Sequence, residues 1–280
     1  RIPQIGQVLD CTAEVLVSKH GLDLVEAERI KKLCDAATAF TFELERLEES
    51  GIRVLSFLDD GFPKRVTDAL GTKSSAFLLV AGNINLFDKP GRGIVGSRNA
   101  SEEIVSVAQW AANAAVKQGD VVVSGLAKGV DRVAMSAALE VDGEVIGVPT
   151  EGIRRIAKAN DIRNLVHEGR ICLVSPYAPD VGFSVGLAMG RNRFVYALSE
   201  STLVVASDLE KGGTWAGAEE ALKGDFAQVD VWTGEGATNG NAALVAKGAR
   251  AVPSRDEFWQ SGFIPAPAVF DTDPEQLKLF

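Results

Sequence analysis

Two patterns of apolar and polar positions divide the chain. Over residues 1–50 apolar side chains recur at helical spacing, which predicts a small helical segment, and Gly21 and Asp23 indicate a break between its helices. Beyond residue 50, short and nearly continuous apolar runs alternate with amphipathic stretches of helical length. Strands that are apolar on both faces and separated by helices are typical of parallel sheets covered on both sides.

These runs predict the elements of one sheet. We expect strands at 93–95, 121–124, 144–148, 171–174, 203–205, 229–232 and 249–252, and helices at 101–118, 129–141, 159–169, 186–199, 214–223 and 240–248. A strand at 52–57, a helical turn at 66–70 and a strand at 76–80 lead into them. The expected fold class is α/β: a Rossmann-like, doubly wound, mainly parallel sheet over residues 51–255, preceded by the helical segment at 1–50 and followed by a C-terminal tail at 256–280.

Composition excludes several classes of protein. No apolar run approaches the ~20 residues of a membrane-spanning helix, and no signal sequence opens the chain, so we expect a cytoplasmic protein without a membrane partner. The three cysteines lie far apart without Cys-x-x-Cys spacing, and the two histidines are His20 and His167. We therefore expect no metal site, no disulfide framework, no cofactor, and no Ser-His-Asp or Cys-His catalytic set.

The net charge of −9 argues at first against a nucleic-acid partner, because Lys and Arg supply most of the affinity for phosphates. The charge is unevenly distributed, however. Basic and acidic side chains balance over residues 91–200, whereas the flanking parts are acidic. The basic residues of this neutral part fall in predicted turns, where they could meet phosphates.

The first such turn, Gly96-Ser97-Arg98, follows the strand at 93–95, and Ser101 is placed to cap the next helix. It lacks the Gly-x-Gly-x-x-Gly pattern, and no acidic residue ends the next strand, which disfavours a dinucleotide. A backbone turn followed by one arginine, whose guanidinium can donate two parallel hydrogen bonds, suits a single phosphate. The alternative is a tight turn with a solvated arginine.

The second turn, 124–129, repeats this pattern with Ser124, Gly125, Lys128 and Gly129. Adjacent parallel strands end at the same sheet edge, so we expect both turns to face one crevice that holds a string of phosphates. Asp131 starts the following helix, where backbone N–H groups should keep it ionised.

Two further segments carry basic or glycine-rich signals. Arg191-Asn192-Arg193 could fork onto phosphates or stack on bases, or its arginines could form structural ion pairs with acidic neighbours. Lys211-Gly212-Gly213-Thr214 forms another glycine-rich turn into a helix, with Thr214 as a cap, and Glu219 is the one carboxylate that could lie beside it. The predicted phosphate-binding residues are Gly96, Ser97, Arg98, Ser124, Gly125, Lys128, Gly129, Arg191, Asn192, Arg193, Lys211, Gly212, Gly213 and Thr214.

The order and spacing of these four segments resemble the DprA/Smf DNA-processing family, within the superfamily that also contains the LOG nucleotide hydrolases. The resemblance covers about residues 60 to 252. It implies a single-stranded DNA-binding protein of natural transformation that presents DNA to a RecA-type recombinase, forms a dimer and is not an enzyme. It also implies that Arg98, Lys128, Arg191, Arg193 and Lys211 lie along the DNA path.

Two other functions use the same turns. A LOG-like nucleoside 5'-monophosphate phosphoribohydrolase would hold the nucleotide phosphate at Gly212-Gly213 and use Glu219 as its carboxylate, although Trp215 and Ala216 stand where that family has Gly-Thr. A nucleotide-sensing domain would need only one closed pocket. A chain of phosphates needs several basic turns in a row.

Overall fold

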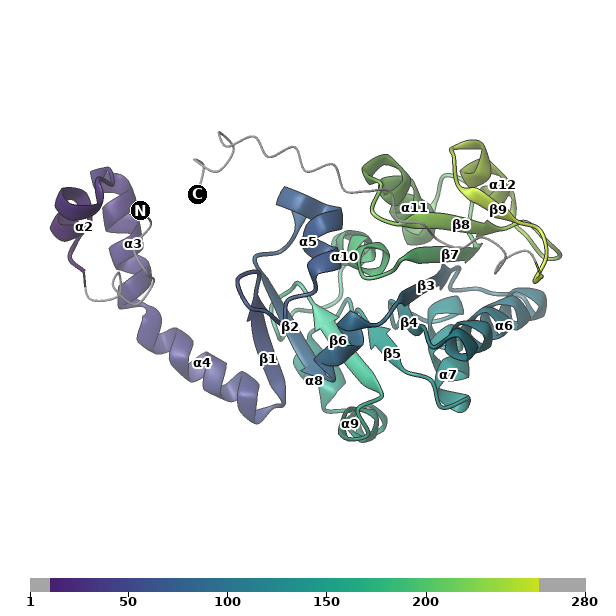
Figure 1. Ribbon diagram of the computed structural model, residues 1–280, viewed down its shortest axis with the longest axis horizontal. Coiled ribbons are helices and arrows are strands. Elements are labelled where there is room, and N and C mark those ends of the chain that lie inside the picture. The colour runs from purple at the N-terminus through teal and green to yellow at the C-terminus, as the bar shows by residue number, and fades with distance from the viewer. Residues whose placement is uncertain (1–10, 257–280) are drawn as a thin grey trace. The chain divides into compact units, whose positions relative to one another are not determined.

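The computed structural model describes residues 11–256 (Figure 1). Its contacts divide the chain after Arg53 into two compact units, each described by itself below. Apart from Asp256, the tail expected at 256–280 lies outside the described residues. No helix in the described part of the chain is long and apolar enough to cross a membrane.

The first unit is helical, with α2 (Ala13–His20), α3 (Leu24–Asp35) and α4 (Ala37–Glu49). The break between α2 and α3 lies where the sequence indicates it. Gly21 ends α2 with a left-handed φ of 70°, and the Asp23 side chain caps α3 by accepting the N–H of Glu26 at 2.8 Å. Leu16 and Ala27 are fully buried where α2 and α3 pack together.

The second unit contains one nine-stranded sheet in the order β1-β2-β6-β5-β4-β3-β7-β8-β9. The strands are β1 (Ile52–Ser56), β2 (Phe77–Gly82), β3 (Gly91–Gly96), β4 (Val121–Ser124), β5 (Val145–Gly147), β6 (Ile171–Ser175), β7 (Ser201–Ala206), β8 (Gln228–Trp232) and β9 (Arg250–Val252). The helices are α5 (Lys64–Leu70), α6 (Glu102–Gln118), α7 (Val130–Glu140), α8 (Ile153–Ala157), α9 (Asn160–His167), α10 (Val185–Ala197), α11 (Gly212–Gly224) and α12 (Asn239–Ala246), with 3₁₀ turns η1 (Gly71–Lys73) and η2 (Ile84–Asp88).

The sheet confirms the expected fold class. Strands β3 to β9 pair in parallel, and β2 joins β6 antiparallel, with Val80 opposite Val174. The sequence prediction missed α8, because this helix is only five residues long and its two arginines interrupt the apolar pattern. The central strands β4, β6 and β7 are buried along their whole length, as the continuous apolar runs predicted.

The direction in which successive strands are added to the sheet reverses at β3, which lies between β4 and β7. From β3 the chain builds the sheet outward through β4 and β5 to β6, and then returns through α10 to β7 and onward to β9. Right-handed crossovers therefore place α6 and α7 on one face and α10 and α11 on the other (Figure 1). The loops after β3 and β7 turn to opposite faces and leave a crevice between them.

A buried amide fixes the carboxyl ends of β7 and β8. Asn241, on α12, is fully buried, and its Oδ1 accepts the N–H of Ser207 at 2.8 Å. Its Nδ2 donates to the carbonyls of Val205 and Trp232 at 2.9 and 2.7 Å. These bonds hold the base of the loop that leads into α11.

We expect Asn241→Ala to lower the free energy of unfolding by about 3 kcal/mol, because it removes the side-chain donor to two buried carbonyls and one of the two side-chain acceptors of the Ser207 N–H. Chemical denaturation followed by circular dichroism measures this difference. Asn239→Ala, an exposed asparagine at the start of the same helix, serves as the control. Equal unfolding midpoints for the two variants would contradict the assigned role of Asn241.

Candidate phosphate-binding site

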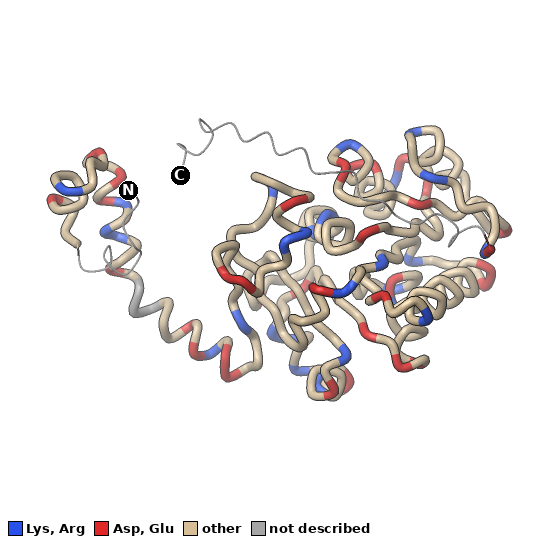
Figure 2. Tube along the Cα trace, viewed as in Figure 1, with Lys and Arg blue, Asp and Glu red and all other residues tan. Residues whose placement is uncertain are grey.

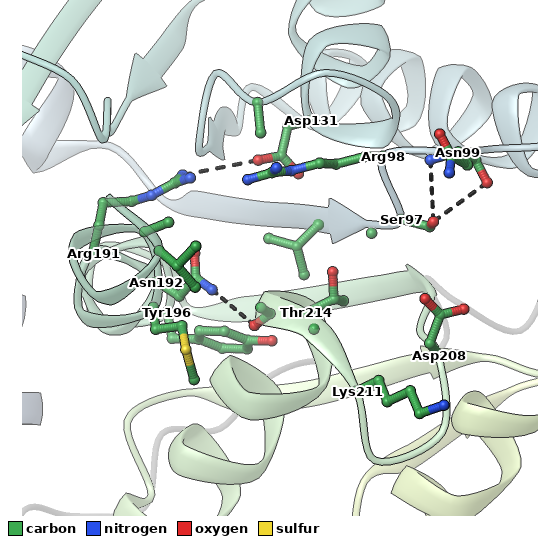
Figure 3. Close-up of a pocket in the computed structure, with 18 residues that line it drawn as sticks. Ser97, Arg98, Asn99, Asp131, Arg191, Asn192, Tyr196, Asp208, Lys211 and Thr214 are labelled. Carbon is green, nitrogen blue, oxygen red and sulfur yellow. Dashed lines mark hydrogen bonds and ion pairs between the residues drawn. The ribbon is translucent and has the colours of Figure 1, made fainter. Parts of the chain in front are cut away.

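A pocket of about 510 Å³ lies at the crevice beyond β3 and β7 (Figure 3). Four segments enclose it: the turn after β3, the turn from β4 into α7, the loop and first turn of α11, and one side of α10. The lining residues are Val95, Gly96, Ser97, Arg98, Asn99, Ala127, Asp131, Val185, Ala188, Met189, Arg191, Asn192, Tyr196, Asp208, Lys211, Gly212, Gly213 and Thr214.

The turn after β3 forms one wall. The hydroxyl of Ser97 accepts the N–H of Asn99 at 3.2 Å, which shapes the turn, and Ser101 caps α6 as expected by accepting the N–H of Ile104 at 3.4 Å. Arg98 is exposed, and its guanidinium lies 5.7 Å from the centre of the Phe183 ring. Within residues 11–256 Arg98 forms no ion pair with a carboxylate, so its charge is available to a ligand.

At the turn after β4, the backbone N–H groups face a carboxylate of the protein itself, that of Asp131. The carboxylate of Asp131 accepts backbone hydrogen bonds from Gly96, Gly125 and Ala127. It also lies 3.8 Å from Nη1 of Arg191 (Figure 3). The N–H groups that the sequence assigns to a ligand phosphate at this turn thus serve an internal carboxylate.

The glycines of this turn are required for close packing. A Cβ at Gly125 would lie 1.3 Å from Nη1 of Arg191, and one at Gly129, where φ is 82°, would lie 2.4 Å from the carbonyl oxygen of Ser97. Neither glycine lines the pocket, nor do Ser124, which is fully buried, and Lys128, which is exposed.

Burial shifts the pKa values of Asp131 and Arg191 in opposite directions. Asp131 and Arg191 are 6% and 4% exposed. Burial raises the pKa of Asp131, against the opposing effects of Arg191 and the backbone N–H groups, and it lowers the pKa of Arg191. The sequence predicted that backbone N–H groups keep Asp131 ionised; these groups do lower its pKa, but desolvation is the larger effect and raises it.

The two arginines of Arg191-Asn192-Arg193 form structural ion pairs. Arg191 is paired with Asp131, and Arg193 is 3.0 Å from Glu220 on α11, outside the pocket lining. Asn192 connects the two helices at the pocket, because its Nδ2 donates to the carbonyl of Gly213 at 2.8 Å (Figure 3). Both arginines thus form the ion pairs that the sequence left open as an alternative, and Arg191 also lines the pocket.

The start of α11 supplies the second polar wall. The helix begins at Gly212 with Lys211 as its N-cap residue and with no side-chain capping bond, so the expectation that Thr214 caps it is wrong. Thr214 instead lies inside the first turn, since the positive φ of 80° at Gly212 lets the helix begin two residues earlier than predicted. The first N–H groups of a helix have no intrahelical acceptor, and they carry partial positive charge.

The sequence did not indicate Tyr196 as a pocket residue. Tyr196 lines the pocket, is 1% exposed, and its hydroxyl has no hydrogen-bond partner in the described part of the chain. Burial raises its pKa, so the hydroxyl stays protonated at neutral pH. The residue falls within the predicted helix at 186–199, in a stretch that is buried all round, and sequence spacing alone does not separate such a tyrosine from a core residue.

Glu219 lies away from this site. Its carboxylate is 3.0 Å from Nζ of Lys247 and 3.5 Å from Nζ of Lys223, and it is not among the residues that line the pocket. The hydrogen bond from Lys247 is the main cause that lowers its pKa. The pocket instead combines Arg98, Lys211 and the N-terminus of α11, an arrangement suited to a phosphate-type anion.

The fold and the pocket define a Rossmann-like α/β protein with a pocket at the point where strand order reverses. The model of the DNA recombination-mediator protein A family matches residues 53–262. The chain therefore belongs to this family, which confirms the DprA/Smf resemblance.

Individual relatives agree with this assignment. DNA processing protein DprA of Bacillus subtilis is 27% identical over 241 residues, which cover 82% of this chain and 77% of that protein. The solved DprA of Streptococcus pneumoniae is similar with a TM-score of 0.66 at 23% identity, over 88% of this chain and 90% of that one. DNA processing protein A of Helicobacter pylori, whose single-stranded DNA binding mode is known, is similar with a TM-score of 0.60 at 24% identity, over 74% and 93% of the two chains.

Arg191 is buried and paired with Asp131, whereas Arg98 is exposed, so we expect their loss to change the free energy of unfolding by different amounts. We expect Arg191→Ala to lower the free energy of unfolding by about 3 kcal/mol, because it leaves Asp131 buried without its partner. Arg98→Ala should change it by less than about 1 kcal/mol, since the side chain is exposed. Thermal melts of both variants measure the difference, and equal melting temperatures would show that the buried pair contributes nothing.

Proposed function

We propose that this protein binds single-stranded DNA through the pocket beyond β3 and β7. The observation that carries the proposal is the convergence of Arg98, Lys211 and the uncapped N-terminus of α11 on one pocket. Membership of the recombination-mediator family supports it, as does the fold shared with the DNA-binding protein of Helicobacter pylori.

The charge distribution favours a local contact over a broad electrostatic surface. Basic and acidic residues are interspersed over the second unit (Figure 2), and the whole chain carries −9. Phosphate binding must therefore rely on a few positioned donors rather than on a basic face. Donors of this kind contact the backbone of the strand and carry no direct information on its sequence, so we infer that binding is independent of sequence.

The remaining parts of the role rest on family membership. We infer that the protein acts in DNA processing and natural transformation in the cytoplasm, presents single-stranded DNA to a RecA-type recombinase, and works as a dimer. A dimer extends the length of strand that is covered, since the pocket of one subunit has room for only a small part of it.

We infer that the protein is not a hydrolase. Glu219, the carboxylate that a nucleotide hydrolase would use, is held by two lysines outside the pocket. Asp131 lies in the pocket, but its oxygens accept three backbone N–H groups and contact Arg191. A general acid or base needs an oxygen free to exchange a proton with the substrate.

Arg98→Ala and Lys211→Ala should each weaken binding of a labelled oligonucleotide about tenfold, because each removes one charged contact with a phosphate. Each should also reduce the slope of log affinity against log salt concentration by about one. Fluorescence anisotropy over a series of salt concentrations measures both quantities.

The control is Lys117→Ala. Lys117 is exposed near the end of α6. This helix leads to the amino end of β4, away from the pocket at the carboxyl ends of β3 and β7, so loss of Lys117 should leave the affinity unchanged. An equal loss of affinity in Arg98→Ala, Lys211→Ala and Lys117→Ala would indicate that the net charge of the protein, rather than a contact in the pocket, determines binding. A wild-type protein that does not bind single strands at low salt, or that binds only duplexes, would overturn the proposal.

Incubation with adenosine, cytidine and guanosine monophosphates should release no free base, as measured by chromatography. The physical reason is the position of Glu219 outside the pocket. Base release that disappears in Glu219→Gln or Asp131→Asn, with Arg98→Ala requiring more substrate, would favour the hydrolase instead.

A further inference from the structure

The middle of α6 carries no charged residue. This helix lies on the surface of the second unit, side by side with α7 (Figure 1). Its acidic and basic side chains are confined to the first and last turns, which leaves Ile104 to Val116 uncharged, and Gln109 is exposed within this stretch. Surface helices usually present charged side chains to water, whereas the centres of protein interfaces are depleted of them. The composition of α6 therefore indicates a surface that another protein covers.

A groove of about 230 Å³ runs between α6 and α7 on this surface. Gln109 of α6 and Val133 and Ala137 of α7 line it, together with Gly129 just before α7. The groove shares no lining residue with the pocket beyond β3 and β7. A contact at the groove therefore uses none of the residues that line the proposed DNA site.

Three exposed side chains form a line along α7. Arg132, Ser136 and Glu140 are the exposed residues of this helix, and all three line the groove. They are spaced by four residues, so they follow one another on one helix face. Arg132 and Glu140 are about 12 Å apart along the helix axis, which is too far for a direct ion pair. In the described part of the chain neither residue is paired with another charged side chain.

This line of residues is complementary to a reversed copy of itself. When two α7 helices lie antiparallel about a two-fold axis at Ser136, Arg132 of each copy faces Glu140 of the other. A two-fold interface brings the same surface of both subunits together, so opposite charges at equal distances from the axis pair twice. Ser136 is small, which lets the two helices approach closely at the axis. The ends and the centre of the line therefore favour a second copy as the occupant of this surface.

We propose that two copies of this chain associate through α6 and α7, with the α7 helices antiparallel and Ser136 at the two-fold axis. This inference rests on the proposed function, because it assigns a surface to the dimer named there. Another protein would have to present an acidic and a basic residue at the same spacing, whereas a second copy supplies them by symmetry. The charges of Arg132 and Glu140 also cancel, so two chains of −9 meet here without bringing like charges together.

The experiment reverses the two charges singly and together. Arg132→Glu and Glu140→Arg each place like charges opposite one another at both ends of the contact, so the Kd for dimerisation should rise at least about tenfold. The double variant Arg132→Glu, Glu140→Arg restores opposite charges and should return the Kd to the wild-type value. Sedimentation velocity over a series of protein concentrations measures these constants.

Two further variants test the position of the contact. Ser136→Trp inserts a large side chain between the two helices and should also raise the Kd for dimerisation. Arg163→Glu reverses the charge of an exposed arginine on α9, outside the groove and without an ion pair in the described residues, and should leave the Kd unchanged. It is therefore the matched control for Arg132→Glu.

The outcomes separate this contact from DNA binding. Weaker dimers in both single variants, with recovery in the double variant, would support the contact. Unchanged dimers in the single variants, or no recovery in the double variant, would overturn it and leave DNA binding as proposed. A wild-type protein that stays monomeric with and without an oligonucleotide would overturn the contact together with the proposed dimer. A dimer that responds to the charge changes but binds no single strands would keep the contact and overturn the proposed DNA-binding function.

Discussion

The buried pair of Asp131 and Arg191 is the interaction on which the pocket depends. It joins the first turn of α7 to α10, and its carboxylate also accepts N–H groups from the turns after β3 and β4. A buried ion pair is costly unless hydrogen bonds satisfy its remaining polar atoms; backbone N–H groups do this for Asp131, whereas Nε of Arg191 has no hydrogen-bond partner in the described part of the chain. The absence of a Cβ at Gly125 provides the space, because any side chain there would overlap the guanidinium. Four chain segments are therefore held in one arrangement around the base of the pocket.

The reversal of strand order decides which turns face a ligand. β3 lies between β4 and β7, and the loops after β3 and β7 diverge toward opposite faces of the sheet. The turn after β4 packs against the turn after β3 instead, with Gly129 touching Ser97 and Arg98. Two turns of similar composition thus have different roles: the turn after β3 contributes Gly96, Ser97 and Arg98 to the pocket lining, whereas the turn after β4 contributes only Ala127 and mainly packs against the first turn.

The pocket also shows how an acidic protein can present a site for a polyanion. The chain carries −9, yet Arg98 and Lys211 stand beside a helix N-terminus whose partial positive charge needs no basic residue. Arg193, Lys223 and Lys247 are paired with glutamates on α11, so their charges are compensated locally. Net charge therefore describes the chain as a whole and does not describe the field inside this pocket.

The sequence by itself determined the α/β class, the alternation of strands and helices, and the pocket-lining segments 96–98 and 211–214, because apolar periodicity and glycine-bearing turns are local properties. The roles of Arg191, Arg193 and the turn at 124–129 were decided only by the tertiary structure. Asp131 lies 60 positions before Arg191, and Glu220 lies 27 positions after Arg193, so no local pattern reveals these pairs. Tyr196 likewise became recognisable only through its surroundings, since whether an aromatic side chain is covered or lines a pocket depends on which elements the fold brings against it.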